Sequence, residues 1–125
     1  MPVTTLYSNL TAQDLTLGDV DALVGYLAAR LQKARKDAPY GSDASRALST
    51  LKRMVETQGD DTRAVFAAAP VTEDLLDSRL RQWNNLVRLT RSWHMEDDFS
   101  DRWNLIEYRD AAAAAEAAAR RLSRL

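Results

Sequence analysis

The stretch Thr16–Leu31, TLGDVDALVGYLAARL, decides the fold class. Its apolar residues recur three or four positions apart, which is the period of one face of an α-helix. Thr16 can cap the first turn, with Asp19 three residues later as its partner in a capping box. The apolar face comprises Val20, Leu23, Val24, Leu27 and Leu31. This pattern predicts an amphipathic helix that buries one side against the rest of the protein.

The same period recurs along the chain, which has only four glycines and three prolines. Pro39 and Gly41 end the first helix. We expect the later helices over residues 42–58, 62–69, 72–94 and 98–125. Short connections favour antiparallel neighbours. The sequence therefore predicts one domain over residues 1–125, an all-α, compact bundle of four main helices plus one short helix, packed in an up-and-down-like antiparallel manner.

Large apolar side chains from all the predicted helices are expected to form the core. They are Val20, Leu23, Leu27, Leu31, Leu48, Leu51, Val55, Phe66, Leu76, Leu80, Trp83, Val87, Phe99, Trp103 and Ile106. Residues 1–10 mix small polar residues with a few apolar ones. We expect these ten residues to form an N-terminal arm, either flexible or docked on the body.

The composition argues against several classes of function. The chain has no cysteine, which excludes disulfides, thiolate catalysis and cysteine-ligated zinc. It has 17 basic and 18 acidic residues, whereas a general nucleic-acid binder usually carries a basic excess. Nucleic acid is thus not the expected partner, although a local basic face stays compatible with these counts. The start MPVTTLYSNL lacks a secretory pattern, and no apolar run approaches a membrane span, so we expect a cytoplasmic protein without a membrane partner.

Residues 91–103, RSWHMEDDFSDRW, hold the only histidine, four acidic residues and two of the three tryptophans. The first interpretation is structural: His94 closes the apolar stripe of the 72–94 helix, where a positive charge complements the helix dipole. The alternative is a general base, a proton sensor or a binding residue. We favour a corner between two helices.

Arg88 and His94 support a catalytic alternative. Five residues separate them, and this spacing resembles the arginine–histidine signature of the HEPN superfamily of small helical ribonucleases and their inactive relatives. In that family the bundle dimerises, and both arginines and histidines converge on one RNA phosphate. The resemblance implies phosphate binding by Arg88 and proton transfer by His94. The family usually has a polar residue after the arginine, where this chain has Leu89.

A polar row on the same predicted helix is a second candidate site. Arg81, Asn84, Arg88 and Arg91 follow at steps of three and four residues and therefore share one helix side. Such a row could bind phosphate or carboxylate groups. The favoured interpretation is a solvated face, paired with acids on neighbouring helices.

Other catalytic templates fit the sequence poorly. Di-iron bundles need Glu-x-x-His pairs, but Arg91 precedes the single histidine by three residues. For magnesium, Glu107 and Asp110 match one half of a paired-acid pattern whose Glu-x-x-Glu half is missing. We therefore expect no metal and no cofactor, and we favour a non-enzymatic protein over an enzyme.

The C-terminal alanine tract, residues 111–119, suggests a partner surface. Alanine has the highest helix propensity, so this segment can be helical with little packing. On the helix expected over residues 98–125, a second apolar stripe lies beside the stripe that contains Phe99 and Trp103. Its members are Leu105, Tyr108, Ala112, Ala115, Ala119 and Leu122. Because a minimal bundle cannot bury both stripes, the sequence predicts a non-enzymatic interaction or assembly module whose last helix meets a second copy, as in a homodimer, or another protein.

Overall fold

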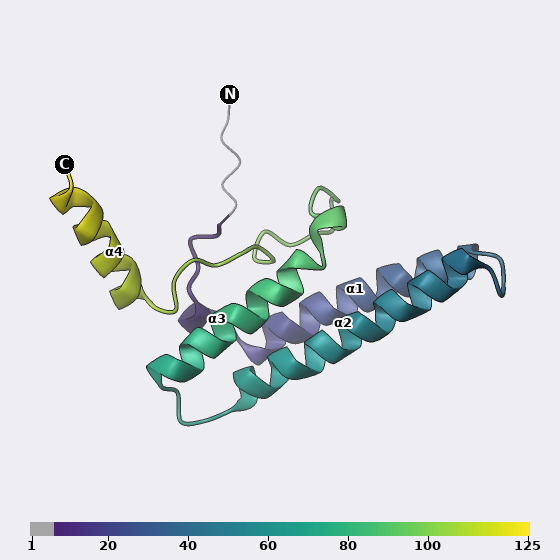
Figure 1. The fold of residues 1–125 in the computed structure, drawn as a ribbon, viewed down its shortest axis with the longest axis horizontal. Coiled ribbons are helices and arrows are strands. Elements are labelled where there is room, and N and C mark those ends of the chain that lie inside the picture. The colour runs from purple at the N-terminus through teal and green to yellow at the C-terminus, as the bar shows by residue number, and fades with distance from the viewer. Residues whose placement is uncertain (1–6) are drawn as a thin grey trace.

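The computed structural model describes residues 7–125 and has the predicted all-α bundle fold (Figure 1). The α1 and α2 helices lie side by side as a long hairpin, α3 packs against one part of it, and α4 projects away from the other three. The elements are η1 (Ala12–Asp14), α1 (Leu17–Asp37), α2 (Asp43–Ala67), α3 (Glu73–Arg88), η2 (Arg91–Trp93) and α4 (Ala111–Ser123). The distal end of the α1–α2 hairpin extends beyond α3 into solvent.

Side-chain caps begin all four α-helices. Thr16 and Asp19 form the predicted capping box of α1, in which each side chain accepts from the other residue's backbone N–H. Ser42, Thr72 and Asp110 cap α2, α3 and α4. Each cap satisfies an N–H group that has no partner within its own helix.

The α2 helix is longer than expected, because the predicted break at residues 58–61 does not exist. Residues 42–58 and 62–69, expected as two helices, form one helix that ends at Ala67. Gly59 is buried where α2 meets α1, and a Cβ atom built on it would lie 2.9 Å from Val24 Cγ2. Glycine therefore permits close approach of the two helices here, and the packing offsets its low helix propensity.

Most of the expected core is observed. Ten of the fifteen predicted side chains are buried: Val20, Leu23, Leu27, Leu31, Val55, Phe66, Leu76, Trp83, Val87 and Ile106. Leu48, Leu80 and Trp103 are partly buried against them, and Phe99 is half-buried. Leu51 is an exception, because it is exposed on the α2 surface. Ala12, Leu15, Val24 and Leu86 complete the buried apolar set.

The largest difference from the sequence prediction lies between α3 and α4. The helix expected over 72–94 ends at Arg88, and the one expected from residue 98 begins only at Ala111. Residues 94–110 form an irregular segment, which we call the connecting segment. Its backbone pairs with other parts of the protein instead of continuing a helix, and it places Ile106 in the core.

The N-terminal arm is docked where the structure describes it. Positions 1–6 of the expected arm lie outside the described residues. Tyr7 forms an isolated parallel bridge with Leu105, and Ser8 N–H donates to the Leu105 carbonyl at 2.8 Å. Ala12 and Gln13 donate to the carbonyls of Tyr108 and Arg109. These bonds attach the start of the described chain to the connecting segment.

Candidate functional site

The acidic and aromatic part of the connecting segment is anchored on α1. Asp98 accepts a hydrogen bond from the Tyr26 hydroxyl at 2.8 Å and one from Arg30 Nη2 at 2.6 Å. These two bonds, with that from Tyr26 the larger cause, hold the pKa of Asp98 below its ordinary value. Tyr26 also packs against Phe99 and Trp103, with ring centroids 5.6 and 4.9 Å away. The cluster therefore fastens this segment to the bundle.

A second anchor joins the connecting segment to the start of α1. Arg102 donates from Nε and Nη2 to the two carboxylate oxygens of Asp19, both at 3.0 Å. Burial raises the pKa of Asp19, but hydrogen bonds from Arg102 and from the Thr16 N–H outweigh it and leave the pKa lowered. Such a bidentate pair fixes geometry as well as charge. Asp19 thus serves both as part of a helix cap and as a docking point.

The structure places Arg88 and His94 on different elements. Arg88 is the last residue of α3, is exposed, and donates to Asn85 Oδ1 at 3.2 Å. His94 follows η2 and is exposed, with Nδ1 2.6 Å from the Arg91 carbonyl oxygen. The helix that would carry both residues thus ends at the first of them. Catalysis by this pair stays a prediction.

The residues of the predicted polar row differ in their exposure to solvent, and not all of them are accessible. Arg81 and Arg88 are exposed, and Arg91, on η2, is half-buried with Nη2 3.5 Å from Asn104 Oδ1. Asn84 is buried, and its side-chain amide bonds the backbone of Ile106 in both directions at 2.9 Å. Asn84 therefore has a structural role in the fold, and the exposed arginines remain as the accessible part of this candidate surface.

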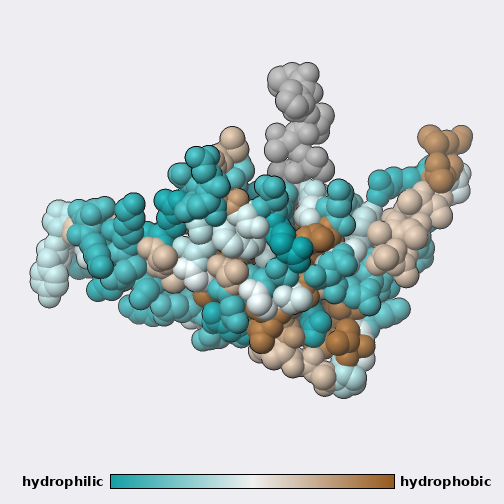
Figure 2. Space-filling view, turned by 180° about the vertical axis from the view of Figure 1, so that it is seen from behind, coloured by the Kyte–Doolittle hydropathy of each residue, from teal (hydrophilic) through white to brown (hydrophobic). Residues whose placement is uncertain are grey.

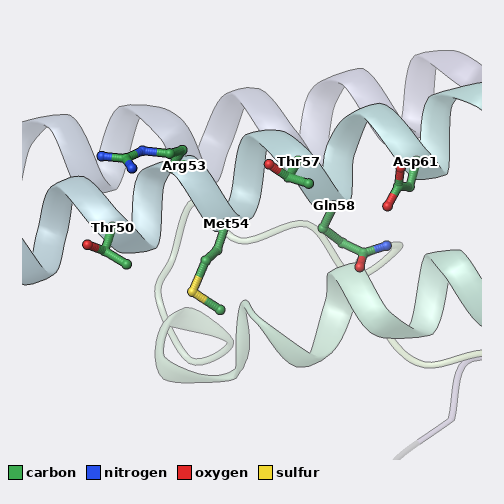
Figure 3. A pocket seen from close by; sticks show the side chains of 6 residues that line it. All are labelled: Thr50, Arg53, Met54, Thr57, Gln58 and Asp61. Atoms are coloured by element: carbon green, nitrogen blue, oxygen red, sulfur yellow. The ribbon is translucent and has the colours of Figure 1, made fainter.

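Shallow hollows line the exposed side of α2. One of about 350 Å³ runs along Thr50, Arg53, Met54, Thr57, Gln58 and Asp61 (Figure 3). Met54 is also part of a smaller apolar hollow of about 130 Å³. Its other lining residues are Leu31, Leu51, Val55, Leu89, Ser92 and Trp93. The apolar hollow has no acidic, basic or histidine residue in its lining, and the larger one has Arg53 and Asp61.

The distal hairpin carries a basic surface that the overall composition hides. Residues 30–56 contain seven basic and three acidic residues, a net charge of +4, whereas the remaining residues carry ten basic and fifteen acidic ones. A hollow of about 280 Å³ on this hairpin is lined by Arg35, Ser49, Lys52, Arg53 and Glu56. A count of charges within this window would have found the surface, whereas the net charge of the whole chain does not.

The α4 helix is attached to the bundle at its first turn and has no buried residue. The Asp110 side chain caps the first turn of this helix, and Arg121 donates to the Tyr108 hydroxyl in the connecting segment. One side of this helix is apolar and exposed, and we call it the α4 apolar face (Figure 2). It consists of Ala111, Ala112, Ala115, Ala118, Ala119, Leu122 and Leu125. The helix projects from the body, with a hydrophobic tip.

The predicted interface stripe is not continuous along one helix. Leu122 lies on the α4 apolar face and is 70% exposed. Leu105 and Tyr108 are half-buried in the connecting segment, where their backbones bond to the N-terminal residues. The stripe is interrupted because the helix begins only at Ala111. Leu122 and the alanines therefore form the exposed part of the predicted interface.

Across residues 7–125, no three histidine, cysteine or acidic side chains gather closely enough to hold a metal ion. None of the helices in the described part of the chain is both long and apolar enough to cross a bilayer. Comparison of the chain with family models, curated proteins and solved structures finds no match.

Proposed function

We propose that this protein is a non-enzymatic assembly module that self-associates through the α4 apolar face. The observation that carries this proposal is the position of α4, a regular helix with an exposed apolar side and no buried residue. Leu122 is 70% exposed and Leu125 is 100% exposed. Apolar side chains gathered on a projecting helix are typical of protein interaction sites.

The physics of short helices supports the same proposal. Isolated helices shorter than about 12–15 residues are marginal in water even when rich in alanine. The α4 helix has 13 residues, and packing in the bundle does little to stabilise it. A second apolar surface would add this stabilisation, and the small alanine side chains permit close approach of another helix backbone.

The size of α4 predicts a weak association. A 13-residue helix is about 20 Å long, so two such helices bury less than the roughly 1,000 Å² of a stable specific interface. We therefore expect a dimer whose population rises with protein concentration, with a dissociation constant in the micromolar range or weaker, above about 1 μM.

Sedimentation velocity over a series of concentrations tests this proposal. Ala115→Glu introduces a charge at the centre of the α4 apolar face and should leave the chain monomeric. Ser123→Glu adds the same charge to the same helix outside that face, and should associate as the unmodified protein does. An unmodified chain that stays monomeric at every concentration, or equal association by both variants, would contradict the proposal.

A further inference from the structure

Charge is segregated in this molecule, and the distal α1–α2 hairpin is its basic part. The hairpin extends beyond α3 (Figure 1), so its surface is open on several sides. Residues 30–56 carry a net charge of +4 within a chain whose net charge is −1. Within residues 7–125, Lys33, Arg35, Lys36 and Arg53 form no ion pair, and all four are exposed. A positive potential is thus concentrated at one end of the protein.

The residues around the basic hollow have the chemistry of a phosphate-binding surface. Arg35 from α1 lines the hollow together with Ser49, Lys52 and Arg53 of α2. Arginine, lysine and serine side chains are the usual donors to nucleic-acid phosphates. Glu56, at the same hollow, is 3.5 Å from Lys52 and leaves the two arginines without an acidic partner.

An exposed aromatic residue stands beside these cations in the sequence. Tyr40 lies in the turn between α1 and α2 and is fully exposed. Gly41, the next residue, has a φ of 75° and so permits the tight turn that presents Tyr40 at the tip. Bases of single-stranded nucleic acids stack on exposed aromatic side chains, and this contact is tolerant of sequence.

We propose that the distal α1–α2 hairpin binds single-stranded nucleic acid, with Arg35, Lys52 and Arg53 contacting phosphates and Tyr40 stacking on a base. An acidic protein fits this surface less well. Protein interfaces have an apolar core with aromatic or arginine anchors, whereas the basic hollow is lined only by polar and charged residues. This binding is separate from the assembly proposed for α4, because it uses the opposite end of the molecule.

Fluorescence anisotropy with labelled oligo(dT) of about 15 nucleotides, near the upper site size of such surfaces, is the direct test. Three phosphate contacts predict that a fourfold rise in salt weakens binding by about 20-fold. Arg35→Glu/Arg53→Glu should abolish measurable binding. Arg120→Glu/Arg124→Glu changes the charge equally on the polar side of α4, where both arginines are exposed, and should retain it. Circular dichroism should show that both variants keep the helical content of the unmodified protein.

Two further comparisons separate nucleic acid from other polyanions. Tyr40→Ala should weaken oligo(dT) binding about tenfold, through the lost stacking, and Tyr40→Phe should not. A duplex of equal length should bind more weakly than the single strand. The proposal is overturned if the unmodified protein does not bind oligo(dT), or if the α4 variant loses binding as the hairpin variant does. It is also overturned if Tyr40→Ala binds normally, or if poly-L-glutamate competes as well as unlabelled oligo(dT).

Discussion

Asn84 and Ile106 are joined by two hydrogen bonds, in which the Asn84 side-chain amide donates to the Ile106 carbonyl and accepts from the Ile106 N–H, each at 2.9 Å. The arrangement imitates a backbone pairing between α3 and the connecting segment. The two bonds satisfy the backbone N–H and the backbone carbonyl of Ile106, whose side chain is fully buried. The connecting segment can therefore bury Ile106, its one buried residue, without forming a helix or a sheet there.

Asn84→Ala is predicted to be strongly destabilising. The substitution leaves the Ile106 N–H and carbonyl without partners in a buried position, and each such group costs about 1–3 kcal/mol. We expect the free energy of unfolding to fall by about 2–4 kcal/mol in urea titrations. Asn85→Ala is the control, since Asn85 is half-buried and, within residues 7–125, its side chain accepts only from exposed Arg88. Equal unfolding midpoints for the two variants would refute this role of Asn84.

The two helical glycines at positions 25 and 59 should respond in opposite ways to the same substitution. Gly25 is exposed in α1, and a Cβ added there would lie more than 4 Å from every other described side chain and from the backbone outside its own helical turn. Gly25→Ala should therefore stabilise the protein by about 1 kcal/mol. At Gly59 the added Cβ would lie 2.9 Å from Val24 Cγ2 and 3.2 Å from its Cγ1. Valine has one preferred rotamer in a helix and cannot turn away, so α1 and α2 must separate.

We expect Gly59→Ala to lower the free energy of unfolding by about 1–2 kcal/mol, because overpacking of about 1–3 kcal/mol exceeds the gain in helix propensity. Thermal unfolding of both variants beside the unmodified protein measures the difference. The double variant Val24→Ala/Gly59→Ala should lose less stability than the two single variants predict together, since Val24→Ala removes the methyl groups with which the Cβ added by Gly59→Ala clashes. Stabilisation by Gly59→Ala alone would show that the contact is not tight.

Sequence reasoning predicted the features of the fold that depend on residues close together in the chain. The capping box of Thr16 and Asp19 spans four residues, and the apolar stripe from Val20 to Leu31 follows directly from the helical period. The break predicted between the helices over 42–58 and 62–69 is wrong because the role of Gly59 depends on Val24, which lies 35 positions earlier. The residues next to Gly59 in the sequence do not indicate that contact.

The connecting segment was predicted as a helix for the same reason. Its apolar residues Phe99, Trp103 and Ile106 have helical spacing, yet Asn84 and Trp83 bond its backbone from positions about twenty residues earlier. These tertiary bonds override the local period. The basic hairpin was hidden in a different way, since whole-chain charge is an average and Arg35 and Arg53 meet only when α1 and α2 pair.

RNA cleavage tests the assignment of Arg88 and His94 as a ribonuclease pair. Their separation between α3 and the residue after η2 leads us to expect that the purified protein leaves a single-stranded RNA intact. His94→Ala is measured beside the unmodified protein to exclude contaminating nucleases. Cleavage by the unmodified protein that disappears in His94→Ala and in Arg88→Ala would contradict this expectation and favour the HEPN-like activity.

Acid should weaken the attachment of the connecting segment to α1. The pKa of Asp19 is lowered in the folded protein, because hydrogen bonds from Arg102 and the Thr16 N–H to the carboxylate outweigh the effect of burial. A lowered folded-state pKa contributes stability that is complete above the unfolded value near 3.8 and is lost as the pH falls through the folded value. Hydrogen bonds from Tyr26 and Arg30 lower the pKa of Asp98 and act in the same direction.

Asp19→Asn should therefore be less stable than the unmodified protein at about pH 6, and the difference should shrink towards zero at about pH 2. Urea unfolding followed by circular dichroism at a series of pH values measures this difference. Asp97→Asn is the control for the loss of one negative charge, because within residues 7–125 its side chain makes no hydrogen bond or ion pair with another residue. If the deficit of Asp19→Asn were the same at both pH values, the carboxylate would contribute no pH-dependent stability, and the Arg102 contact would not anchor the segment through its charge.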